Sequence, residues 1–246
     1  MKATILAAGA GKRLRPLTEN VPKCMIEILN KPIIKWIYDS LIEIGIDDIT
    51  IISGYRENVL IDYAKENLKG CRFVTQDKQT GTADALYLAK DYMDEDFLCL
   101  PGDTIFKADD LMKLRQIRNS LLYTKQTTKL EEFGTLDLKG DMILNINEKS
   151  TEPTSNFINC SAYHFSPEIF DYIPKTEIDS RFNERILTNT INLLIKDKKT
   201  FNAISIKERN EISYPDDIKE IEHRLTTLTP KEEEIIKNRL KELNYL

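Results

Sequence analysis

A short stretch near the N-terminus combines two glycines with a cluster of cationic side chains. Gly9 and Gly11 follow a buried-strand pattern at Ile5-Leu6, and glycines let a backbone turn tightly while its N–H groups stay exposed. The cations of the stretch are Lys12, Arg13, Arg15 and Lys23. Exposed amides beside concentrated positive charge at a strand end are what a polyphosphate needs. The stretch therefore predicts that the chain binds the phosphates of a nucleotide.

Two other phosphate-binding motifs do not fit this stretch. The P-loop requires Ser or Thr after Gly-Lys, whereas Gly11-Lys12 is followed by Arg13. The dinucleotide-binding fingerprint requires a third glycine, and Leu14 stands in its place. The alternative is a plain turn between a strand and a helix, in which the glycines only tighten the bend. Such a turn does not account for the density of positive charge, so we favour phosphate binding.

A second polar stretch, Gln76-x4-Gly81-Thr82-Ala83, follows another predicted strand and opens a helix. The planar amide of Gln76 offers a donor and an acceptor, which suits the imide edge of uracil or thymine. A flipped amide suits cytosine equally, so the residue type does not choose the pyrimidine. The alternative is that Gln76 only caps the helix. We expect the stretch to face a base.

A third stretch places a carboxylate at a strand end. The apolar run 97–100 leads into Pro101-Gly102-Asp103, where the glycine allows a close approach. A hard divalent cation prefers such an oxygen ligand together with phosphate oxygens and water. Asp103 is therefore our candidate metal ligand, with an ordinary turn residue as the alternative.

These motifs share one family resemblance. The N-terminal stretch contains Leu6-Ala7-Ala8-Gly9-x-Gly11-x-Arg13-Leu14-x-Pro16-Leu17-Thr18, followed by Pro22-Lys23. This pattern resembles the signature of the sugar-1-phosphate nucleotidylyltransferases, which include glucose-1-phosphate thymidylyltransferases and uridylyltransferases. The resemblance implies that Arg13 and Lys23 contact the triphosphate and its α-phosphate, and that Asp103 holds Mg²⁺. The nucleotide-binding residues that it implies are Leu6, Ala8, Gly9, Gly11, Gln76, Gly81, Thr82 and Gly102.

Three shorter matches concern the sugar. Glu148-Lys149 resembles the Glu-Lys-Pro of the family, with the proline replaced. Asn159 opens a match to Asn-x-Gly-x-Tyr, in which Ser161 departs from the glycine. The resemblance implies that Gly134, Glu148 and Asn159 contact the sugar, and that Lys149 contacts its phosphate.

A further match near the C-terminus carries the largest departure from the family. Residues 209–218 resemble Trp-x-Asp-Ile/Val-x-Tyr-Pro-Trp-Asp-Leu, and neither tryptophan is present. Aligned on Tyr214-Pro215, the family's metal-binding aspartate falls on Glu211. A glutamate can ligate Mg²⁺, although its additional methylene moves the oxygens by roughly 1.5 Å. We expect Glu211 to be the second metal ligand.

The elements that position these residues alternate over the first half of the chain. The strand patterns lie at 5–6, 49–54, 72–75 and 97–104, and the helical patterns lie at 32–45, at 57–68 and after Gly81. Such alternation implies a mainly parallel sheet with ligands at the carboxyl ends of its strands.

The second half mixes the two kinds of element. Helical patterns lie at 109–117 and 185–195, and strand patterns lie at 121–123, 132–138, 142–146 and 201–206. We therefore predict an α/β fold, a three-layer Rossmann-like domain with a mixed, mostly parallel sheet over residues 1–227. A capping box at Thr229 predicts a C-terminal helical appendage over 228–246.

Composition excludes several classes of protein. The 246 residues carry a net charge of −5, which argues against binding a nucleic-acid backbone. No apolar run approaches the ~20 residues needed to cross a bilayer, and no signal peptide is recognised, so we expect a cytoplasmic protein without a membrane partner. Two histidines are too few for His-rich metal sites. The cysteines indicate reduced core thiols: Cys24, Cys71, Cys99 and Cys160.

Together these features predict transfer of a nucleotidyl group from UTP or dTTP to a sugar 1-phosphate, with Mg²⁺ as cofactor. The sugar phosphate is already ionised at neutral pH, so its attack needs no general base. Two alternatives stay open: a cytidylyltransferase acting on phosphocholine-like acceptors, and a non-catalytic regulatory subunit that binds nucleotide sugars. Glu211 favours the regulatory subunit, whereas Arg13, Lys23 and Asp103 weigh against it. The sugar stays open, as does the oligomeric state, for which a homo-oligomer is one option.

Overall fold

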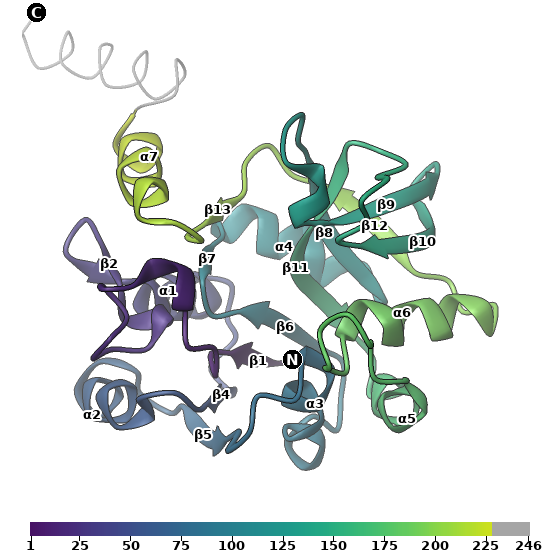
Figure 1. Cartoon of the computed structure of the whole chain (residues 1–246). Coiled ribbons are helices and arrows are strands. Elements are labelled where there is room, and N and C mark those ends of the chain that lie inside the picture. The colour runs from purple at the N-terminus through teal and green to yellow at the C-terminus, as the bar shows by residue number, and fades with distance from the viewer. Residues whose placement is uncertain (228–246) are drawn as a thin grey trace, which may run out of the picture.

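The computed structural model describes residues 1–227, which form a mixed β-sheet with helices on both faces (Figure 1). The strands of the main sheet are β1 (Lys2–Leu6), β4 (Ile49–Ser53), β5 (Arg72–Thr75), β6 (Phe97–Pro101), β8 (Ser120–Lys125), β9 (Gly134–Lys139), β10 (Met142–Glu148), β11 (Phe157–Phe165) and β12 (Asn202–Ser205). Two short pairs lie outside it: β2 (Glu27–Ile28) with β3 (Lys31–Pro32), and β7 (Thr104–Ile105) with β13 (Asn210–Glu211). Its α-helices are α1 (Ile33–Glu43), α2 (Glu57–Asn67), α3 (Thr82–Tyr87), α4 (Ala108–Gln116), α5 (Ile169–Tyr172), α6 (Leu187–Lys196) and α7 (Pro215–Thr226). The predicted appendage over 228–246 lies outside the described residues.

The first half of the chain builds the parallel part of the sheet. Strands β5, β4, β1 and β6 lie side by side in that order, and all three pairings are parallel. The β-branched run of β4 is buried along its whole length, as expected for a strand with both faces covered. Because the strands are parallel, their carboxyl ends meet at one edge, where the phosphate loop, Gln76 and Asp103 follow them.

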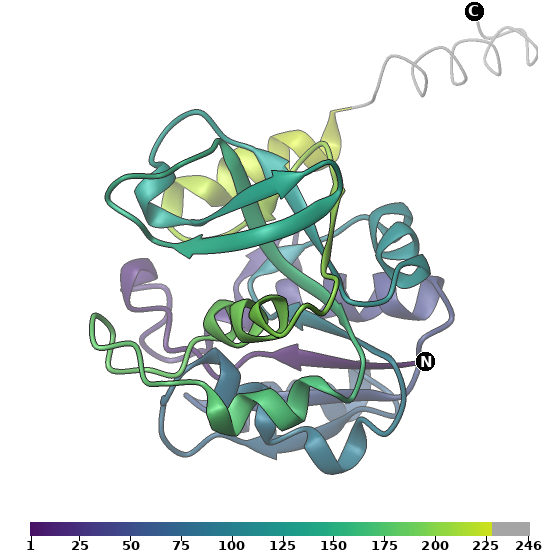
Figure 2. The same cartoon turned by 90° about the vertical axis from the view of Figure 1, so that its right-hand side faces the viewer.

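The second half continues the same sheet with antiparallel pairings. β11 pairs with both β6 and β8 in antiparallel register, and β8 pairs with β12 in parallel register. β10 and β9 form an antiparallel hairpin at the far end of the sheet from β5 (Figure 2). The predicted mixed sheet is confirmed, with its parallel strands concentrated in the N-terminal half.

Helices cover the two faces of the sheet and form two hydrophobic clusters. One cluster joins α1, α2 and α4 to the sheet, with Ile34, Ile37 and Leu41 of α1 fully buried or nearly so. The other cluster joins α3, α5 and α6, with Phe97 and Phe165 of the sheet at its centre. Two helical layers around one sheet are the predicted three-layer arrangement.

The chain returns to the carboxyl edge of the sheet after β12. Strand β13 pairs antiparallel with β7, the short strand that directly follows Asp103, so that Glu211 lies opposite Thr104. Helix α7 then begins at Pro215, where the Asp217 carboxylate accepts from the backbone N–H groups of Ser213 and Tyr214. This return brings the segment 209–217 into the candidate site.

Several elements differ from the sequence-based expectation. β11, α5 and α7 were not predicted as elements, although β11 lies at the centre of the sheet. The helix that was predicted after Gly81 is short: α3 ends at Tyr87, and the next residue, Leu88, is 38% exposed. Cys71 is only partly buried, whereas Cys24, Cys99 and Cys160 are buried free thiols as expected. Within residues 1–227, no helix combines the length and apolar character that spanning a bilayer requires.

Candidate active site

A cavity of about 940 Å³ opens at the carboxyl ends of β1 and β6 and continues along β9, β10 and β11. Its walls come from both halves of the chain, with Leu6 and Pro101 on one side and Ile158 on the other. Most of the predicted site residues line it: Leu6, Ala8, Gly9, Arg13, Lys23, Gln76, Gly81, Thr82, Asp103, Gly134, Glu148, Lys149, Asn159 and Glu211. The fold therefore gathers residues that lie as much as 205 positions apart (211 − 6) in the sequence.

Two predicted nucleotide-binding residues, Gly11 and Gly102, do not line this cavity. Gly11 has a left-handed φ of +57°, and its carbonyl accepts a 2.8 Å hydrogen bond from the Thr18 hydroxyl. A Cβ added at Gly102 would lie 2.9 Å from the Ala7 Cα, so only glycine lets the two strand ends pack this closely. In the structure both glycines shape the backbone beneath the site.

Lys23 and Asp103 form the ion pair at the centre of the site. The Lys23 Nζ lies 2.5 Å from the Asp103 Oδ2, and the Thr104 hydroxyl donates to the other carboxylate oxygen at 3.1 Å. Burial acts to raise the pKa of Asp103, but the charge and hydrogen bond of Lys23 outweigh it, so the pKa is lowered. Asp103 is therefore a carboxylate at neutral pH, as a metal ligand must be.

Arg13 lines the same cavity. Its Nη1 donates to the Tyr214 hydroxyl at 3.2 Å, and its guanidinium lies 5.1 Å from the centre of that ring. The Glu132 carboxylate lies 3.7 Å from the same nitrogen. With 53% of its side chain exposed, Arg13 is oriented by these partners yet open to an anionic ligand.

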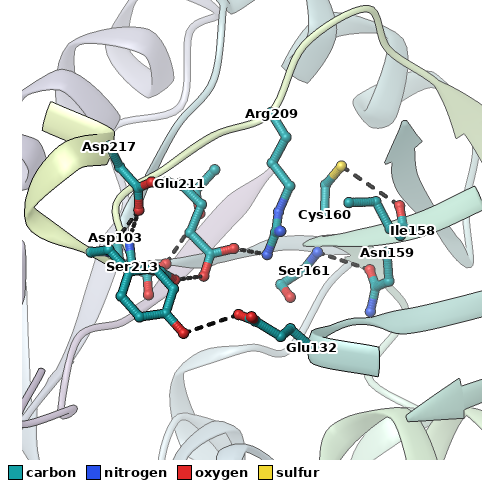
Figure 3. A network of polar contacts seen from close by, with 12 residues as sticks. Asp103, Glu132, Ile158, Asn159, Cys160, Ser161, Arg209, Glu211, Ser213 and Asp217 are labelled. Carbon is teal, nitrogen blue, oxygen red and sulfur yellow. Dashed lines mark hydrogen bonds and ion pairs between the residues drawn. The ribbon is translucent and has the colours of Figure 1, made fainter. Parts of the chain in front are cut away.

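Glu211 lies beside Asp103 and is engaged by two groups. It contacts the Arg209 guanidinium in an ion pair, and its Oε1 accepts from the Ser213 hydroxyl at 2.6 Å (Figure 3). The N–H of the next residue, Ile212, donates to the Asp103 carbonyl at 3.0 Å, which fixes the two carboxylate-bearing segments together.

The residues present fit a magnesium ion that binds together with substrate phosphates. Over residues 1–227, no three His, Cys, Asp or Glu side chains gather into a ready metal site, so the candidate donors are Asp103 and Glu211. Mg²⁺ is usually held by one or two carboxylates, and it completes its octahedron with waters and phosphate oxygens. Asp103 and Glu211, two neighbouring carboxylates that line the cavity, match that donor set.

The predicted base-facing segment is clamped to the segment before α6. Gln76 is 8% exposed, and its Nε2 donates to the Gly81 carbonyl at 3.2 Å. Gly81 has a φ of +120°, and a Cβ there would lie only 2.2 Å from the Arg185 carbonyl oxygen. The Thr82 hydroxyl accepts from the Leu187 N–H at 3.0 Å. Gly81 and Thr82 therefore fix the segment that contacts the Gln76 amide against residues 185–187.

The predicted sugar-binding residues face one another across the β9–β11 side of the cavity. The Glu148 Oε2 accepts from the Thr188 hydroxyl at 3.0 Å, and a Cβ at Gly134 would lie 2.9 Å from that oxygen. The Asn159 Oδ1 accepts from the Ser161 N–H at 2.8 Å. Ser161 takes a left-handed φ of +59°, which explains physically why a glycine suits this position in the family pattern.

Several residues of the site were missed from sequence. They are Gln79, Phe133, Phe182, Thr188, Arg209 and Tyr214, all of which line the cavity. Arg209 had an available signal, because it occupies the position of the family's first tryptophan two residues before Glu211. Tyr214 and Gln79 lie within stretches that the sequence analysis singled out, whereas Phe133, Phe182 and Thr188 come from segments that only the tertiary fold brings to the cavity.

Comparisons with known proteins agree with this geometry. A family model described as nucleotidyl transferase matches residues 2–222. The chain is 34% identical over 236 residues to UTP–glucose-1-phosphate uridylyltransferase AglF of Haloferax volcanii, covering 92% of this chain and 96% of that protein. It is 39% identical over 221 residues to the bifunctional protein GlmU of Methanocaldococcus jannaschii, covering 89% of this chain and 53% of that protein. The chain thus spans about half the length of this second relative.

The fold also resembles a solved structure. A crystal structure of UDP-glucose pyrophosphorylase complexed with UDP-glucose superposes with a TM-score of 0.81, covering 91% of this chain and 97% of that one. The sequences are 21% identical, so this likeness supports the fold alone.

Proposed function

We propose a reaction for this chain on the premise that it belongs to the nucleotidyl transferase family. Its predicted resemblance to the sugar-1-phosphate nucleotidylyltransferases is confirmed by the family match and by its uridylyltransferase relative. The proposed reaction joins a pyrimidine nucleoside triphosphate, UTP or dTTP, to a sugar 1-phosphate. A phosphate oxygen of the sugar phosphate forms a bond to the α-phosphorus. The bond from that phosphorus to the bridging oxygen breaks, and the electron pair leaves with pyrophosphate.

The observation that carries this proposal is the position of the Lys23–Asp103 pair. The pair lines one cavity together with Gln76 and Gly81, which follow β5, and with Glu148 and Asn159 of β10 and β11. In the proposal a nucleotide lies against Gln76 and Gly81, a sugar lies against Glu148 and Asn159, and their phosphates meet at this pair. Holding the two substrates in line there supplies much of the catalysis of such a transfer.

The proposed chemistry needs no general base. The attacking phosphate oxygen already carries negative charge at neutral pH, so no proton has to be removed from it. Neither histidine of the chain lines the cavity, which is consistent with that requirement. What the transition state requires is fixed positive charge on its phosphate oxygens.

Three cations of the cavity meet this requirement in the proposal. Lys23 would stabilise charge at the α-phosphate, Arg13 would hold the departing phosphates, and Lys149 would hold the phosphate of the sugar. Asp103 and Glu211 would hold Mg²⁺, which when bound neutralises phosphate charge and orients both substrates. Each cation now has a protein partner, so substrate phosphates would replace carboxylates, a hydroxyl or aromatic faces as those partners.

The substrates are supported at different levels of detail. The uridylyltransferase relative, which this chain covers almost fully, favours UTP and glucose 1-phosphate. The Gln76 amide suits uracil and thymine alike, so it favours neither UTP nor dTTP.

A substrate panel tests the proposal. The protein is incubated with Mg²⁺, each common nucleoside triphosphate and a set of sugar 1-phosphates, and released pyrophosphate is measured. We expect release that requires both a pyrimidine nucleotide and a sugar 1-phosphate. Release with phosphocholine and CTP instead would support the cytidylyltransferase alternative, and binding of nucleotide sugars without any turnover would support a regulatory subunit.

A further inference from the structure

Arg209 is a largely buried cation that lines the cavity and that the proposed chemistry does not use. Its side chain is 14% exposed, and its guanidinium lies 4.7 Å from the centre of the Phe133 ring. The Arg209 carbonyl accepts a 3.1 Å hydrogen bond from the Arg224 Nη1, which ties its backbone to α7. The side chain thus lies between the Phe133 ring and Glu211, and Figure 3 shows its contact with Glu211.

The hydrogen bonds of Arg209 are incomplete. Its Nε is buried and has no hydrogen-bond partner among residues 1–227, although a guanidinium presents five N–H donors in a fixed fork. A buried donor without an acceptor is costly, and a phosphate offers the several oxygens that would satisfy such a fork. The cavity that Arg209 lines is the place where the proposed phosphates meet.

The contact with Arg209 also conflicts with the predicted role of Glu211. A carboxylate that is paired with a guanidinium and also accepts from Ser213 has little negative charge left for a dication. Asp103 is compensated in the same way by Lys23. In this state the formal charges of the two carboxylates and their two cationic partners sum to zero.

The position of Arg209 in the cavity indicates which of the two substrate phosphates it would contact. Arg209 lies between Glu211 on one side and Asn159 and Ser161 of β11 on the other (Figure 3), and Asn159 is a predicted sugar-binding residue. The pyrophosphate end of the nucleotide would instead extend toward the phosphate loop with Gly9 and Arg13. The phosphate on the sugar side of the junction is that of the acceptor.

We propose that Arg209 binds the phosphate of the sugar 1-phosphate. In the free protein, Glu211 pairs with the Arg209 guanidinium until this acceptor binds. The exchange of partners leaves Glu211 free to act as the second carboxylate of the metal site. The inference rests on the proposed function for the identity of the acceptor. Substrate binding and completion of the metal site are then coupled through one ion pair.

Metal binding to the free protein tests the coupling without any turnover. Mn²⁺ is titrated into the wild type and into Arg209→Gln, with free Mn²⁺ followed by electron paramagnetic resonance. We expect Arg209→Gln to bind Mn²⁺ about tenfold or more tightly, because the cation that competes for Glu211 is gone. The double variant Arg209→Gln/Glu211→Gln should lose this gain, since the gain depends on the freed carboxylate.

A matched control removes a different cation from the rim of the same cavity. Lys207 lines the cavity with 85% of its side chain exposed, and its ion-pair partner is Glu208 rather than Glu211. Lys207→Gln should change Mn²⁺ affinity by less than about twofold. An affinity of Arg209→Gln equal to that of wild type or of this control overturns the inference.

Steady-state kinetics then test the phosphate contact. In Arg209→Gln we expect the KM for the sugar 1-phosphate to rise about tenfold or more while the KM for the nucleotide changes less than about threefold. Arg209→Lys should lie between this variant and wild type, because it keeps the charge but loses the planar fork. Equal changes in both KM values overturn the assignment to the acceptor. Because the Mn²⁺ titration needs no turnover, it stays decisive even if no sugar phosphate proves to be a substrate.

Discussion

The Nζ of Lys23 lies 2.5 Å from the Oδ2 of Asp103, which joins the phosphate loop to the strand end that carries the predicted metal ligand. The pair comes from residues 80 positions apart, and both side chains line the cavity. In the proposed reaction each side chain gives up the other for a phosphate or a metal. In the free protein, each side chain therefore balances a charge that a phosphate or a metal ion would balance in the complex. Both side chains should be needed for catalysis.

The first prediction concerns the cation of this pair. Lys23→Ala should lower turnover by about a hundredfold or more, because it removes fixed charge worth ~3 kcal/mol at the transition state. Pyrophosphate release at saturating substrates measures the effect. Lys12→Ala is the control, since Lys12 belongs to the same loop but does not line the cavity. Turnover of Lys23→Ala within about threefold of wild type would remove Lys23 from the mechanism.

The second prediction concerns the two carboxylates. Asp103→Asn should lose as much activity as Glu211→Gln or more, whereas Glu211→Asp should retain activity, because an amide oxygen is a poorer ligand for a hard dication. Activity is measured across a magnesium titration for each variant. If Glu211→Gln is as active as wild type at every concentration of magnesium, Glu211 is not a ligand.

The third prediction concerns the base. Gln76→Ala should weaken the binding of UTP by ~1–3 kcal/mol, since polar groups of the base would lose their partner. Calorimetric titration with UTP and with ATP measures the effect and its specificity. The structure adds that Gln76 already bonds to the Gly81 carbonyl, so its amide is oriented before the nucleotide binds. An equal loss for the two nucleotides would show that Gln76 does not recognise the base.

The sequence predicted the N-terminal half of this fold better than the C-terminal half. Strands such as β4 are buried on both faces, and β-branched runs like Ile49-Thr50-Ile51-Ile52 predict them from the sequence. β11 was missed because its register shifts between Asn159 and Tyr163, where Ser161 takes a left-handed φ. A strand interrupted in this way shows no clean alternation along the chain.

The residues of the candidate site also differ in how far the sequence could place them. Residues in the motif-bearing loops after a strand, such as Arg13 after β1 and Asp103 after β6, could be placed by motif and topology together. Arg209 was missed although it occupies the position of the family's first tryptophan, because its role depends on contacts with Phe133 and Glu211 that the sequence does not show. An arginine alone in a polar stretch is usually a surface residue.

The fourth prediction concerns backbone geometry at Gly81. Gly81→Ala should destabilise the protein by ~1–3 kcal/mol, because the φ of +120° disfavours a side chain and the added Cβ would meet the Arg185 carbonyl. Thermal unfolding measures the loss. Gly9→Ala is the control, since a Cβ there has no neighbour within 4 Å. Equal melting temperatures for Gly81→Ala and Gly9→Ala would contradict the clamp between Gly81 and Arg185.

The fifth prediction concerns the stability of the fold in acid. His164 is 3% exposed, its Nδ1 lies 3.1 Å from the Leu114 carbonyl, and burial lowers its pKa. A neutral ring that donates from Nδ1 is therefore favoured in the folded state. As the pH falls below about 6.5, the His164 ring takes up a proton in the unfolded chain at a higher pH than in the folded chain. The free energy of unfolding therefore decreases as the pH falls.

The measurement for this prediction is the free energy of unfolding in urea between pH 7 and pH 5. His164→Gln should lessen the decline with acid, because it removes the buried ring whose protonation the folded state disfavours. A wild-type curve that is flat over this range, or identical declines for the wild type and His164→Gln, would contradict the role of His164.

The central claim is that a sugar phosphate attacks the α-phosphorus of a nucleotide held at Lys23 and Asp103. The most direct test uses UTP labelled at the α-phosphorus, supplied with glucose 1-phosphate and Mg²⁺, followed by separation of the products. We predict that the label appears in a nucleotide sugar, in an amount equal to the pyrophosphate released, and that Asp103→Asn abolishes this product. Label recovered as UMP would mean that water is the acceptor, and label that stays in UTP while nucleotide sugars bind would mean that the chain does not catalyse the transfer.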